Sequence, residues 1–380
     1  MKVLVTACPT YGHFFPLVPL CWALRNGGHD VLVALPGRFA DVAVAAGLPA
    51  VRLGPDCPVR DFVPDDHAVQ DSSTAALIDH VVAYYLPLAE RLAGRTVELA
   101  AEWRADVVLH TPWEHAGPLA AAVVGIPTVI QTWGVALPPE LPGAAAAALA
   151  DLHRRWGLAG VAEPTWTVDV CPPSLQYPDA HSATLPMTYV PYNGSGPVPM
   201  WLLERSDRPR ICVTLGSIPI PGDHASVLDV VLAGLSDVAA DVVLVTGGNL
   251  APLDDLPPHI RAVTGLPLSH ALPTCDAIVH HGGSGTTMTS TAFGLPQLAL
   301  PQMCDQYRHA ERLAAAGAGI QLLPGQVDAE TVRASVTALL DDGSHRAAAW
   351  ALRTEIRRRP SPDLVADSLH DLVRLAEVRS

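Results

Sequence analysis

The sequence has 380 residues, of which 49% are hydrophobic and 16% charged, so it is long enough for two domains with buried cores and is not that of a disordered chain. Asp and Glu (38) outnumber Lys and Arg (24) and give a formal net charge of −14, which argues against a basic surface for nucleic acid. The seven Cys are scattered with no C-x-x-C pair, which predicts neither a disulfide framework nor a zinc site.

The first half of the chain alternates short apolar runs with longer helical patterns. Residues 2–7 form a continuous apolar run typical of a buried strand, and residues 14–25 carry apolar side chains at helical spacing. Further strand patterns lie at 30–34, 106–110 and 128–131, with an apolar helix near 117–124. Strands that are apolar along their whole length indicate a parallel sheet that helices cover on both faces.

A turn-rich stretch, residues 191–199, precedes a second series of the same kind. Strand patterns return at 210–215, 241–246, 260–264, 277–280, 297–300 and 320–323, with helices at 226–239, 328–340 and 344–375. We therefore predict two doubly wound, Rossmann-like α/β domains that face each other across a cleft, with a ligand at the carboxyl ends of both sheets. The predicted division is an N-terminal domain over 1–195, a linker over 196–209, a C-terminal domain over 210–360 and a final helix over 361–380 that packs back towards the N-terminal domain.

The segment from His280 to Thr287 reads His-His-Gly-Gly-Ser-Gly-Thr-Thr and stands between a strand and a helix. Its glycines let the backbone approach an anion closely, and the start of a helix offers unpaired amides and a partial positive charge. Ser284 and Thr286 add hydroxyl donors, and His281 can donate to a phosphate oxygen. A tight turn after the strand is the alternative, but the two His before the glycines favour an anion site.

Asp305 and Gln306 lie just beyond the strand expected at 297–300. A carboxylate that only accepts hydrogen bonds, beside an amide that donates and accepts, suits the neighbouring hydroxyls of a sugar. Asp305 also suits the N-cap of the helix that begins near Tyr307, and taken by itself this second interpretation is the better one.

These segments resemble the donor-binding signature of the family 1 nucleotide-sugar glycosyltransferases, and most closely the bacterial enzymes that glycosylate antibiotic aglycones of the aromatic polyketide type. The matching residues read HGGSGT from His281, GLP from Gly294, PQMCDQ from Pro301 and, in the N-terminal loop, TYGHFFPL from Thr10. The resemblance covers essentially the whole chain. It implies a GT-B fold in which the N-terminal domain binds the acceptor and the C-terminal domain binds the donor.

The resemblance also implies roles for single residues on the donor side. The residues that would hold the diphosphate are Ser217, His281, Gly282, Gly283, Ser284, Gly285 and Thr286. For Ser217, a β–α turn with a helix cap is an equal alternative. Asp305 and Gln306 would hold the sugar, and Gly265 with Leu266 would hold the nucleobase. Related enzymes often carry a Trp near Gly265 that stacks on the nucleobase, and this chain lacks it. The backbone of Leu266 is then expected to pair with the base, and both thymidine and uridine stay open as the nucleoside of the donor.

His13 is the candidate catalytic base. It stands at the head of a helix after the first strand, where a neutral imidazole facing a cleft can take a proton from an acceptor hydroxyl; a helix-initiating His without that role is the alternative. The resemblance places His13 on the family's base, whose usual partner is an Asp after the fourth strand. Thr111 stands there instead, so we name Glu114 as the substitute partner. The alternative role of Glu114 is that of an acid in the first turn of the next helix, where it stabilises the helix N-terminus. A weaker base fits a phenol or an activated aromatic carbon as the nucleophile.

Aromatic residues make up only 5% of the chain, yet several fall in its N-terminal loops. We expect Phe14, Trp113 and Trp133 to stack on a flat, apolar acceptor. No D-x-D motif occurs, so we expect no metal on the diphosphate and no other cofactor.

The predicted function is therefore an inverting glycosyltransferase that moves a sugar, expected to be a deoxy sugar, from a thymidine or uridine diphosphate to an apolar aromatic natural product, O- or C-linked. Two alternatives stay open: a nucleotide-sugar 2-epimerase on the same scaffold, and a catalytically silent binding or activator subunit. No G-x-G-x-x-G follows the first strand, which disfavours a nicotinamide enzyme. The chain starts on a strand pattern and has no apolar run of the ~20 residues that span a membrane, so we expect a cytoplasmic protein without nucleic-acid or membrane partners. A homodimer stays open.

Overall fold

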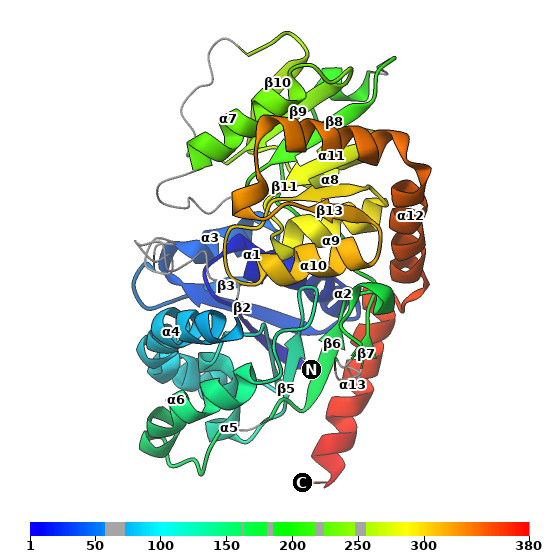
Figure 1. Ribbon diagram of the computed structural model, residues 1–380. Helices are drawn as coiled ribbons and strands as arrows, with labels where there is room; N and C mark the ends of the chain where they lie inside the picture. Colours follow the sequence, from blue (N-terminus) through cyan, green and yellow to red (C-terminus); the bar gives the residue numbers. More distant parts are fainter. Residues whose placement is uncertain are drawn as a thin grey trace.

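Two parallel β-sheets organise the chain, one in each half, and the helices pack around them (Figure 1). The computed structural model describes residues 1–57, 73–161, 163–178, 180, 185–204, 206–216, 224–247 and 256–379. Across these ranges every helix is too short or too polar to cross a membrane.

The N-terminal sheet reverses its strand order beside its first strand. In order across the sheet, the strands are β3 (Ala50–Leu53), β2 (Asp30–Pro36), β1 (Lys2–Thr6), β4 (Val107–His110), β5 (Thr128–Gln131), β6 (Trp166–Asp169) and β7 (Leu185–Pro186). The helices are α1 (Tyr11–Phe14), α2 (Val18–Asn26), α3 (Ala40–Ala45), α4 (Thr74–Trp103), α5 (Ala116–Val124) and α6 (Leu141–Arg155). Because the order reverses between β1 and β4, the segments that follow these two strands meet at one edge of the sheet.

The C-terminal sheet repeats this plan. Its strands, in order across the sheet, are β10 (Ile260–Thr264), β9 (Asp241–Thr246), β8 (Arg210–Thr214), β11 (Ala277–His280), β12 (Gln297–Ala299) and β13 (Gly319–Gln321). Its helices are α7 (His224–Leu235), α8 (Leu268–Ala271), α9 (Ser284–Phe293), α10 (Gln306–Ala315), α11 (Ala329–Asp341) and α12 (Gly343–Arg358), and the chain ends in α13 (Pro362–Arg379). The reversal lies between β8 and β11, which brings the turn after Thr214 beside the glycine-rich turn after His280.

Both faces of the first strand are buried, and successive side chains enter different cores. Val3 and Val5 belong to the cluster that includes α2, whereas Leu4 belongs to the cluster that includes α4 and α5. Successive side chains of a strand point to opposite faces. A strand that is covered on both sides therefore has no polar face, which is why its sequence reads as a continuous apolar run.

Two helical patterns in the sequence are broken by proline. The helix predicted over 14–25 is divided into α1, a 3₁₀ turn at Phe15–Leu17 and α2, because Pro16 and Pro19 disturb the hydrogen bonding of a single helix. The helix predicted over 344–375 is likewise two helices, α12 and α13, separated at Pro360.

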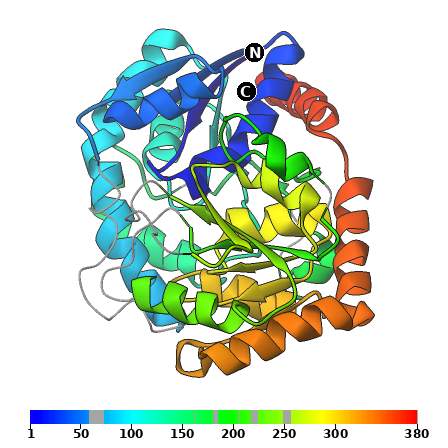
Figure 2. The ribbon, with the colours of Figure 1, turned by 90° about the horizontal axis from the view of Figure 1, so that it is seen from above.

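The last helix leaves the C-terminal half and packs on the N-terminal half. Figure 1 shows α13 running past β6 and β7, and Figure 2 shows it beside the N-terminal sheet. Its Val365, Leu369 and Val373 share a core with Leu20 and Leu24 of α2. Just before this helix, the guanidinium of Arg359 pairs with the carboxylate of Asp169 at 2.9 Å, which fixes the point where the chain crosses over.

Candidate active site

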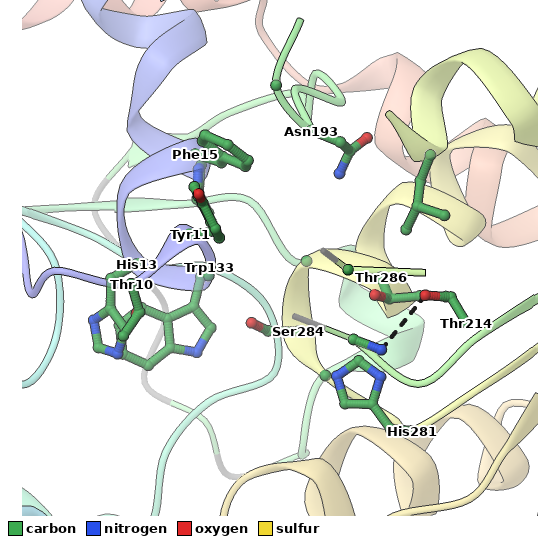
Figure 3. A pocket seen from close by; sticks show the side chains of 18 of the residues that line it. Thr10, Tyr11, His13, Phe15, Trp133, Asn193, Thr214, His281, Ser284 and Thr286 are labelled. Carbon is green, nitrogen blue, oxygen red and sulfur yellow. Dashed lines mark hydrogen bonds between the residues drawn. The ribbon is translucent and has the colours of Figure 1, made fainter. Parts of the chain in front are cut away.

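A cavity of about 890 Å³ lies between the two sheets and is lined from both halves. Its N-terminal wall contains Thr10, Tyr11, His13, Phe15, His80, Tyr85, Trp113 and Trp133, and its C-terminal wall contains Thr214, Gly216, Gly265, Leu266, His281, Gly283, Ser284, Gly285, Thr286, Met303, Cys304, Asp305 and Gln306. Figure 3 shows His13 and Trp133 on one side of the open space and His281, Ser284 and Thr286 on the other.

His13 lies in a pocket of aromatic rings. The ring centroids of Tyr85, Trp113 and Trp133 are 5.5, 5.3 and 4.4 Å from that of His13. This burial lowers the pKa of His13 to about 3, against a smaller opposing effect of its hydrogen bond to the Pro112 carbonyl. His13 is therefore a neutral imidazole at physiological pH, the state that can accept a proton.

The hydroxyl of Thr111 stands beside His13. Its Oγ1 is 3.5 Å from Nδ1 of His13, and the Thr111 side chain is fully buried. Thr111, the residue that follows the fourth strand, therefore lies beside the imidazole, at the position where the family resemblance implies the partner of the base. It brings a hydroxyl instead of a carboxylate.

Glu114 is placed away from His13, which corrects the expectation that it is the partner of the base. Its carboxylate accepts hydrogen bonds from the hydroxyl of Thr6 at 2.6 Å and from the amides of Ala116 at 2.9 Å and Gly117 at 3.1 Å. Among the hydrogen bonds of the described residues, none joins Glu114 to His13. Glu114 satisfies the first amides of α5, where a carboxylate is favoured by the helix dipole, although its own pKa is raised by burial.

Two of the three predicted acceptor residues line the cavity. Trp113 and Trp133 form its aromatic wall, and Trp113 holds a positive φ of 68°, a conformation that costs energy for a residue with a Cβ. Phe14 is instead fully buried in the core, because the short helix α1 turns it away and presents Tyr11 and Phe15. Tyr85, from the long helix α4, also lines the cavity; the sequence offers it as one of several N-terminal aromatic residues, but nothing in α4 singles it out for the site.

His281 is held between two glycines from different strand ends. A Cβ atom on Gly216 would lie 2.7 Å from Cε1 of the His281 ring, and one on Gly283 would lie 2.3 Å from Nε2. The ring therefore occupies space that only glycine leaves. Gly283 is the N-cap of α9, so His281, Ser284, Gly285 and Thr286 surround the free amides of that helix.

Gly282 shapes the diphosphate turn, although its own position is buried. Gly282 is buried in the turn: it has a φ of +81°, and its amide donates to Nδ1 of His280 at 3.0 Å, so it shapes the loop from behind. His280, whose other ring nitrogen donates to Oε1 of Gln297 at 2.9 Å, is the fully buried anchor of this loop. Ser217 lies outside the described residues, and Thr214 and Gly216 before it line the cavity.

Gly265 and Leu266 line the end of the cavity where the segment between the halves crosses it. Asn193 of that segment accepts a hydrogen bond from the amide of Ser269 at 3.0 Å and donates one to Oγ1 of Thr289 at 3.1 Å. The connecting segment is thus fastened to the C-terminal half, and Asn193, Gly194 and Ser195 line the cavity. Asn193 lies in the turn-rich stretch 191–199, three residues before the predicted linker, and the sequence did not indicate that it lines the cavity.

Asp305 and Gln306 face the cavity from the start of α10. Asp305 is the N-cap by position, but in the described part of the chain its carboxylate makes no capping hydrogen bond. Nδ1 of His309 lies 3.8 Å from Oδ2 of Asp305, and burial raises the pKa of this carboxyl group against smaller opposing effects of its neighbours. The side-chain carbonyl of Gln306 accepts from the amides of Gln302 at 2.9 Å and Met303 at 3.2 Å. Within the described ranges, no three His, Cys, Asp or Glu side chains gather as a metal site.

Comparison with solved structures defines the class of protein. The fold superposes on the spinosyn rhamnosyltransferase SpnG with a TM-score of 0.87 and 33% sequence identity, over 97% of this chain and 100% of that chain. SpnG is also known in complex with thymidine diphosphate and with spinosyn aglycone. Two facing α/β domains with this cavity between them are the GT-B architecture, and the chain is a glycosyltransferase.

Its family follows from the sequence matches. Residues 22–216 match the N-terminal domain, and residues 229–372 the C-terminal domain, of the family described as erythromycin biosynthesis protein CIII-like. The chain is 41% identical to the L-demethylnoviosyl transferase of Streptomyces niveus over 97% of both proteins. It is 34% identical to the tylactone mycaminosyltransferase of Streptomyces fradiae, over 99% of this chain and 93% of that one. The chain therefore belongs to the erythromycin biosynthesis protein CIII-like family of glycosyltransferases.

Proposed function

We propose that this chain transfers a deoxy sugar from a thymidine diphosphate donor to an apolar, aromatic natural product, with inversion at the anomeric carbon. The observation that carries the proposal is a neutral His13 on one wall of a cavity whose opposite wall is His281 and the start of α9 (Figure 3). His13 can take a proton from an acceptor hydroxyl, and the wall formed by His281 and the start of α9 suits a diphosphate. Thymidine is favoured over uridine by the complex of SpnG with thymidine diphosphate.

The diphosphate is proposed to lie on the turn that runs from His281 to Thr286. The free amides of α9, the hydroxyls of Ser284 and Thr286 and the imidazole of His281 donate to its oxygens, and the helix dipole favours its negative charge. Ser217 remains part of this proposed set. These donors stabilise the charge that develops on the leaving diphosphate, so the proposal includes no metal and no cofactor.

The reaction is proposed to be one displacement. The acceptor atom attacks the anomeric carbon from the face opposite the diphosphate, the bond from that carbon to the diphosphate oxygen breaks, and the electron pair leaves with the diphosphate. His13 takes the proton from the attacking hydroxyl. Attack from the opposite face in a single step inverts the anomeric configuration.

A sugar with few hydroxyl groups fits the polar groups that remain. The side-chain carbonyl of Gln306 is already bonded to two backbone amides, which leaves it little capacity to accept a hydrogen bond from a sugar hydroxyl. The neighbouring lining residues, Met303 and Cys304, offer no strong hydrogen-bonding group. Each extra sugar hydroxyl would lose water without gaining a partner, which favours a deoxy sugar.

The acceptor is proposed to lie on the aromatic N-terminal wall. Trp113, Tyr85, Tyr11 and Phe15 present ring surface suited to a flat, apolar aglycone. A threonine hydroxyl polarises His13 less than a carboxylate would, so the base suits a nucleophile that is already activated. A phenol would give an O-linked product, and an electron-rich aromatic carbon a C-linked one.

The test is a panel of nucleotide sugars followed by a transfer assay. Thymidine and uridine diphosphate forms of glucose and of 6-deoxy sugars are first compared by their effect on the melting temperature; a donor at a hundred times its Kd stabilises the fold by about 2.7 kcal/mol. The stabilising donor is then incubated with aromatic polyketide aglycones, and products are identified by mass and by the NMR coupling of the anomeric proton. Stabilisation by adenosine diphosphate sugars alone, or a product of retained configuration, would contradict the proposal.

A further inference from the structure

A chain of hydrogen bonds runs behind the glycine-rich turn, from β11 through β12 into α9. The amide of Gly282 donates to Nδ1 of His280 at 3.0 Å, and Nε2 of His280 lies 2.9 Å from Oε1 of Gln297. Nε2 of Gln297 lies 3.0 Å from Oγ1 of Thr291, whose hydroxyl donates to the carbonyl of Thr287 at 2.8 Å. The side chains of His280, Gln297 and Thr291 are buried, so water does not compete for these bonds.

The direction of every bond in this chain is determined by its two ends. A backbone amide can only donate, so Nδ1 of His280 is the ring nitrogen without a hydrogen, and Nε2 carries one. Nε2 therefore donates to Oε1 of Gln297. At the far end, the hydroxyl of Thr291 uses its only hydrogen on a backbone carbonyl and accepts from Nε2 of Gln297, which fixes the orientation of that side-chain amide. Only the neutral Nε2–H tautomer of His280 fits these partners.

The surroundings of His280 favour this neutral state. Burial lowers its pKa to about 3, and the nearby His281 and His309 lower it further, while the hydrogen bond to Gln297 acts in the opposite direction. Among the described residues, His281 in the turn and His309 on α10 are the titratable groups that act on this ring. A protonated His280 would carry a hydrogen on Nδ1 as well and would turn it against the amide hydrogen of Gly282.

The bond to His280 holds Gly282 in a conformation that favours glycine. Gly282 has a φ of +81°, and its amide bonds back to the side chain two residues earlier, as in an Asx turn. A Cβ atom on Gly282 would lie 3.0 Å from the carbonyl oxygen of Gln306. The turn therefore packs directly on the start of α10, where the two candidate sugar ligands lie.

The neighbouring strand end has the same kind of bond. Thr214 of β8 is the register partner of His280, and its Oγ1 accepts from the amide of Gly216 at 3.4 Å. A Cβ atom on Gly216 would lie 2.7 Å from the ring of His281, which shares this side of the cavity with Thr214 (Figure 3). Two side chains at adjacent strand ends thus fix the two glycine turns that surround His281.

We propose that His280 is a positioning residue for the donor diphosphate: its Nδ1 holds Gly282 and so sets the turn that presents His281, while Gln297 selects the tautomer that can do so. This inference rests on the proposed function. The two adjacent His then have separate roles, because His281 lines the cavity and His280 is fully buried behind it. The amide of Gly282 is not free to bind phosphate, because His280 already accepts its hydrogen.

The bond from Gly282 to His280 can be tested in the ligand-free wild-type protein. Gly282 is the only Gly in the sequence that follows a His. Labelling His with ¹³C at the carbonyl and Gly with ¹⁵N therefore gives a single His–Gly correlation by NMR, which belongs to the amide of Gly282. We expect this amide hydrogen to exchange with water at least about a hundredfold more slowly than in the urea-unfolded chain. Exchange at the unfolded rate would overturn the proposal whatever the protein binds.

Two substitutions of His280 separate its Nδ1 from its ring. His280→Asn supplies an oxygen that can accept from the amide two residues on, as in an Asx turn, whereas the longer side chain in His280→Gln places its amide group near the former Nε2. Both variants lose the ring, so both should be less stable than the wild-type protein. Calorimetric titration should show thymidine diphosphate binding about tenfold more weakly to His280→Gln and within about threefold of wild type to His280→Asn. Equal affinities of the two variants would contradict the proposal.

Gln297→Glu tests the tautomer through pH. A carboxylate beside Nε2 raises the pKa of His280, so the ring takes up a proton as the pH falls and turns a hydrogen towards the Gly282 amide. Between pH 8 and 5.5, the affinity for thymidine diphosphate should fall at least about tenfold more than in the wild-type protein. Gln321→Glu, on β13 outside the hydrogen-bond chain, adds the same charge and should follow the wild-type profile. A wild-type profile for Gln297→Glu would overturn the role of Gln297.

These measurements also separate this proposal from the proposed function. If the wild-type protein binds no thymidine diphosphate, the proposed function fails and the positioning role fails with it. If the wild-type protein binds thymidine diphosphate and the two His280 variants bind it equally well, the positioning role alone is wrong.

Discussion

His13 is kept neutral by burial and not by a charged partner. Three aromatic rings surround it, and its pKa of about 3 leaves it unprotonated across the physiological range. A base of this kind is weak but always available. Its usefulness then depends on the acidity of the acceptor, which is why we propose a phenol or an activated carbon.

Replacing His13 tests this role. His13→Ala should lower kcat by roughly 10²–10⁴ while leaving donor binding nearly unchanged, because the ring accepts a proton and is not in contact with the diphosphate turn. The loss should be smaller for acceptors with more acidic hydroxyls. Rates measured on a series of phenols of different pKa check this; a loss below tenfold for every acceptor would assign the base elsewhere.

Glu114 shows how a charged residue near a candidate site can serve the fold. Glu114→Gln replaces an oxygen that accepts from backbone amides with an amide that donates, so it should lower the free energy of unfolding by about 1–3 kcal/mol. Turnover should be largely kept. Urea denaturation and kcat measured on one preparation check both; a stable variant with kcat as low as that of His13→Ala would restore Glu114 as the partner of the base.

Residue types and spacing located most of the candidate site but not the direction of each side chain. The sequence motif placed the aromatic pair Phe14 and Phe15 beside His13, and the structure brings Phe15, not Phe14, to the cavity. The phase of a four-residue helix broken by Pro16 cannot be derived from periodicity. Tyr85 was one of several aromatic residues available and could not be selected from the sequence, because it comes from a helix distant in sequence from His13.

At the scale of elements, the turn before α9 depends on two glycines from different loops, Gly216 and Gly283, which leave room for the ring of His281. Gly283→Ala is the cleaner test, because its φ of −60° suits alanine and only the His281 ring obstructs the new methyl group. We expect the displaced imidazole to raise the donor KM about tenfold with little change in stability. Gly143→Ala, in an exposed helix with open space around the new Cβ, is the matched control and should leave the donor KM unaltered. A normal KM for Gly283→Ala would remove His281 from the donor site.

Elements with a strong local pattern were predicted well, and those defined by tertiary contacts were not. The strands at 241–246, 260–264 and 277–280 occur as predicted; β9 and β11 are buried along almost their whole length, whereas β10, at the edge of the sheet, is exposed at Arg261, Ala262 and Thr264. The 30-residue helix α4 was not predicted; it contains Pro87 and mixes apolar and polar residues, so packing against α5 and α6 decides its length. The predicted domain boundaries, at residues 195 and 210, stay a prediction. The last strand of the N-terminal sheet, β7, ends at Pro186, and the first strand of the C-terminal sheet, β8, begins at Arg210.

At the scale of the whole molecule, buried histidines should make the fold sensitive to acid. Burial lowers the pKa of His110 to about 4 and those of His115 and His280 to about 3. In the unfolded chain these groups take up protons below about pH 6.5, so the free energy of unfolding should fall by roughly 1.4 kcal/mol per pH unit for each of them as the pH drops from 6.5 towards 4.

Carboxyl groups oppose this trend only in part. Glu114 and Asp305 have raised pKa values, so their protonation in the folded state adds stability as the pH falls through those values. Urea denaturation between pH 8 and 5 should therefore show a plateau above pH 7 and a decline below it, and His115→Leu should make the decline shallower. A stability that is constant down to pH 5 would contradict the neutral, buried state of these residues.

The central claim is that the diphosphate of the donor lies on the turn at His281, opposite His13, and calorimetric titration with thymidine diphosphate tests it most directly. We predict that His281→Ala weakens binding at least tenfold, whereas His13→Ala binds as the wild-type protein does and yet has a kcat lower by roughly 10²–10⁴. Unchanged affinity in His281→Ala would contradict the account.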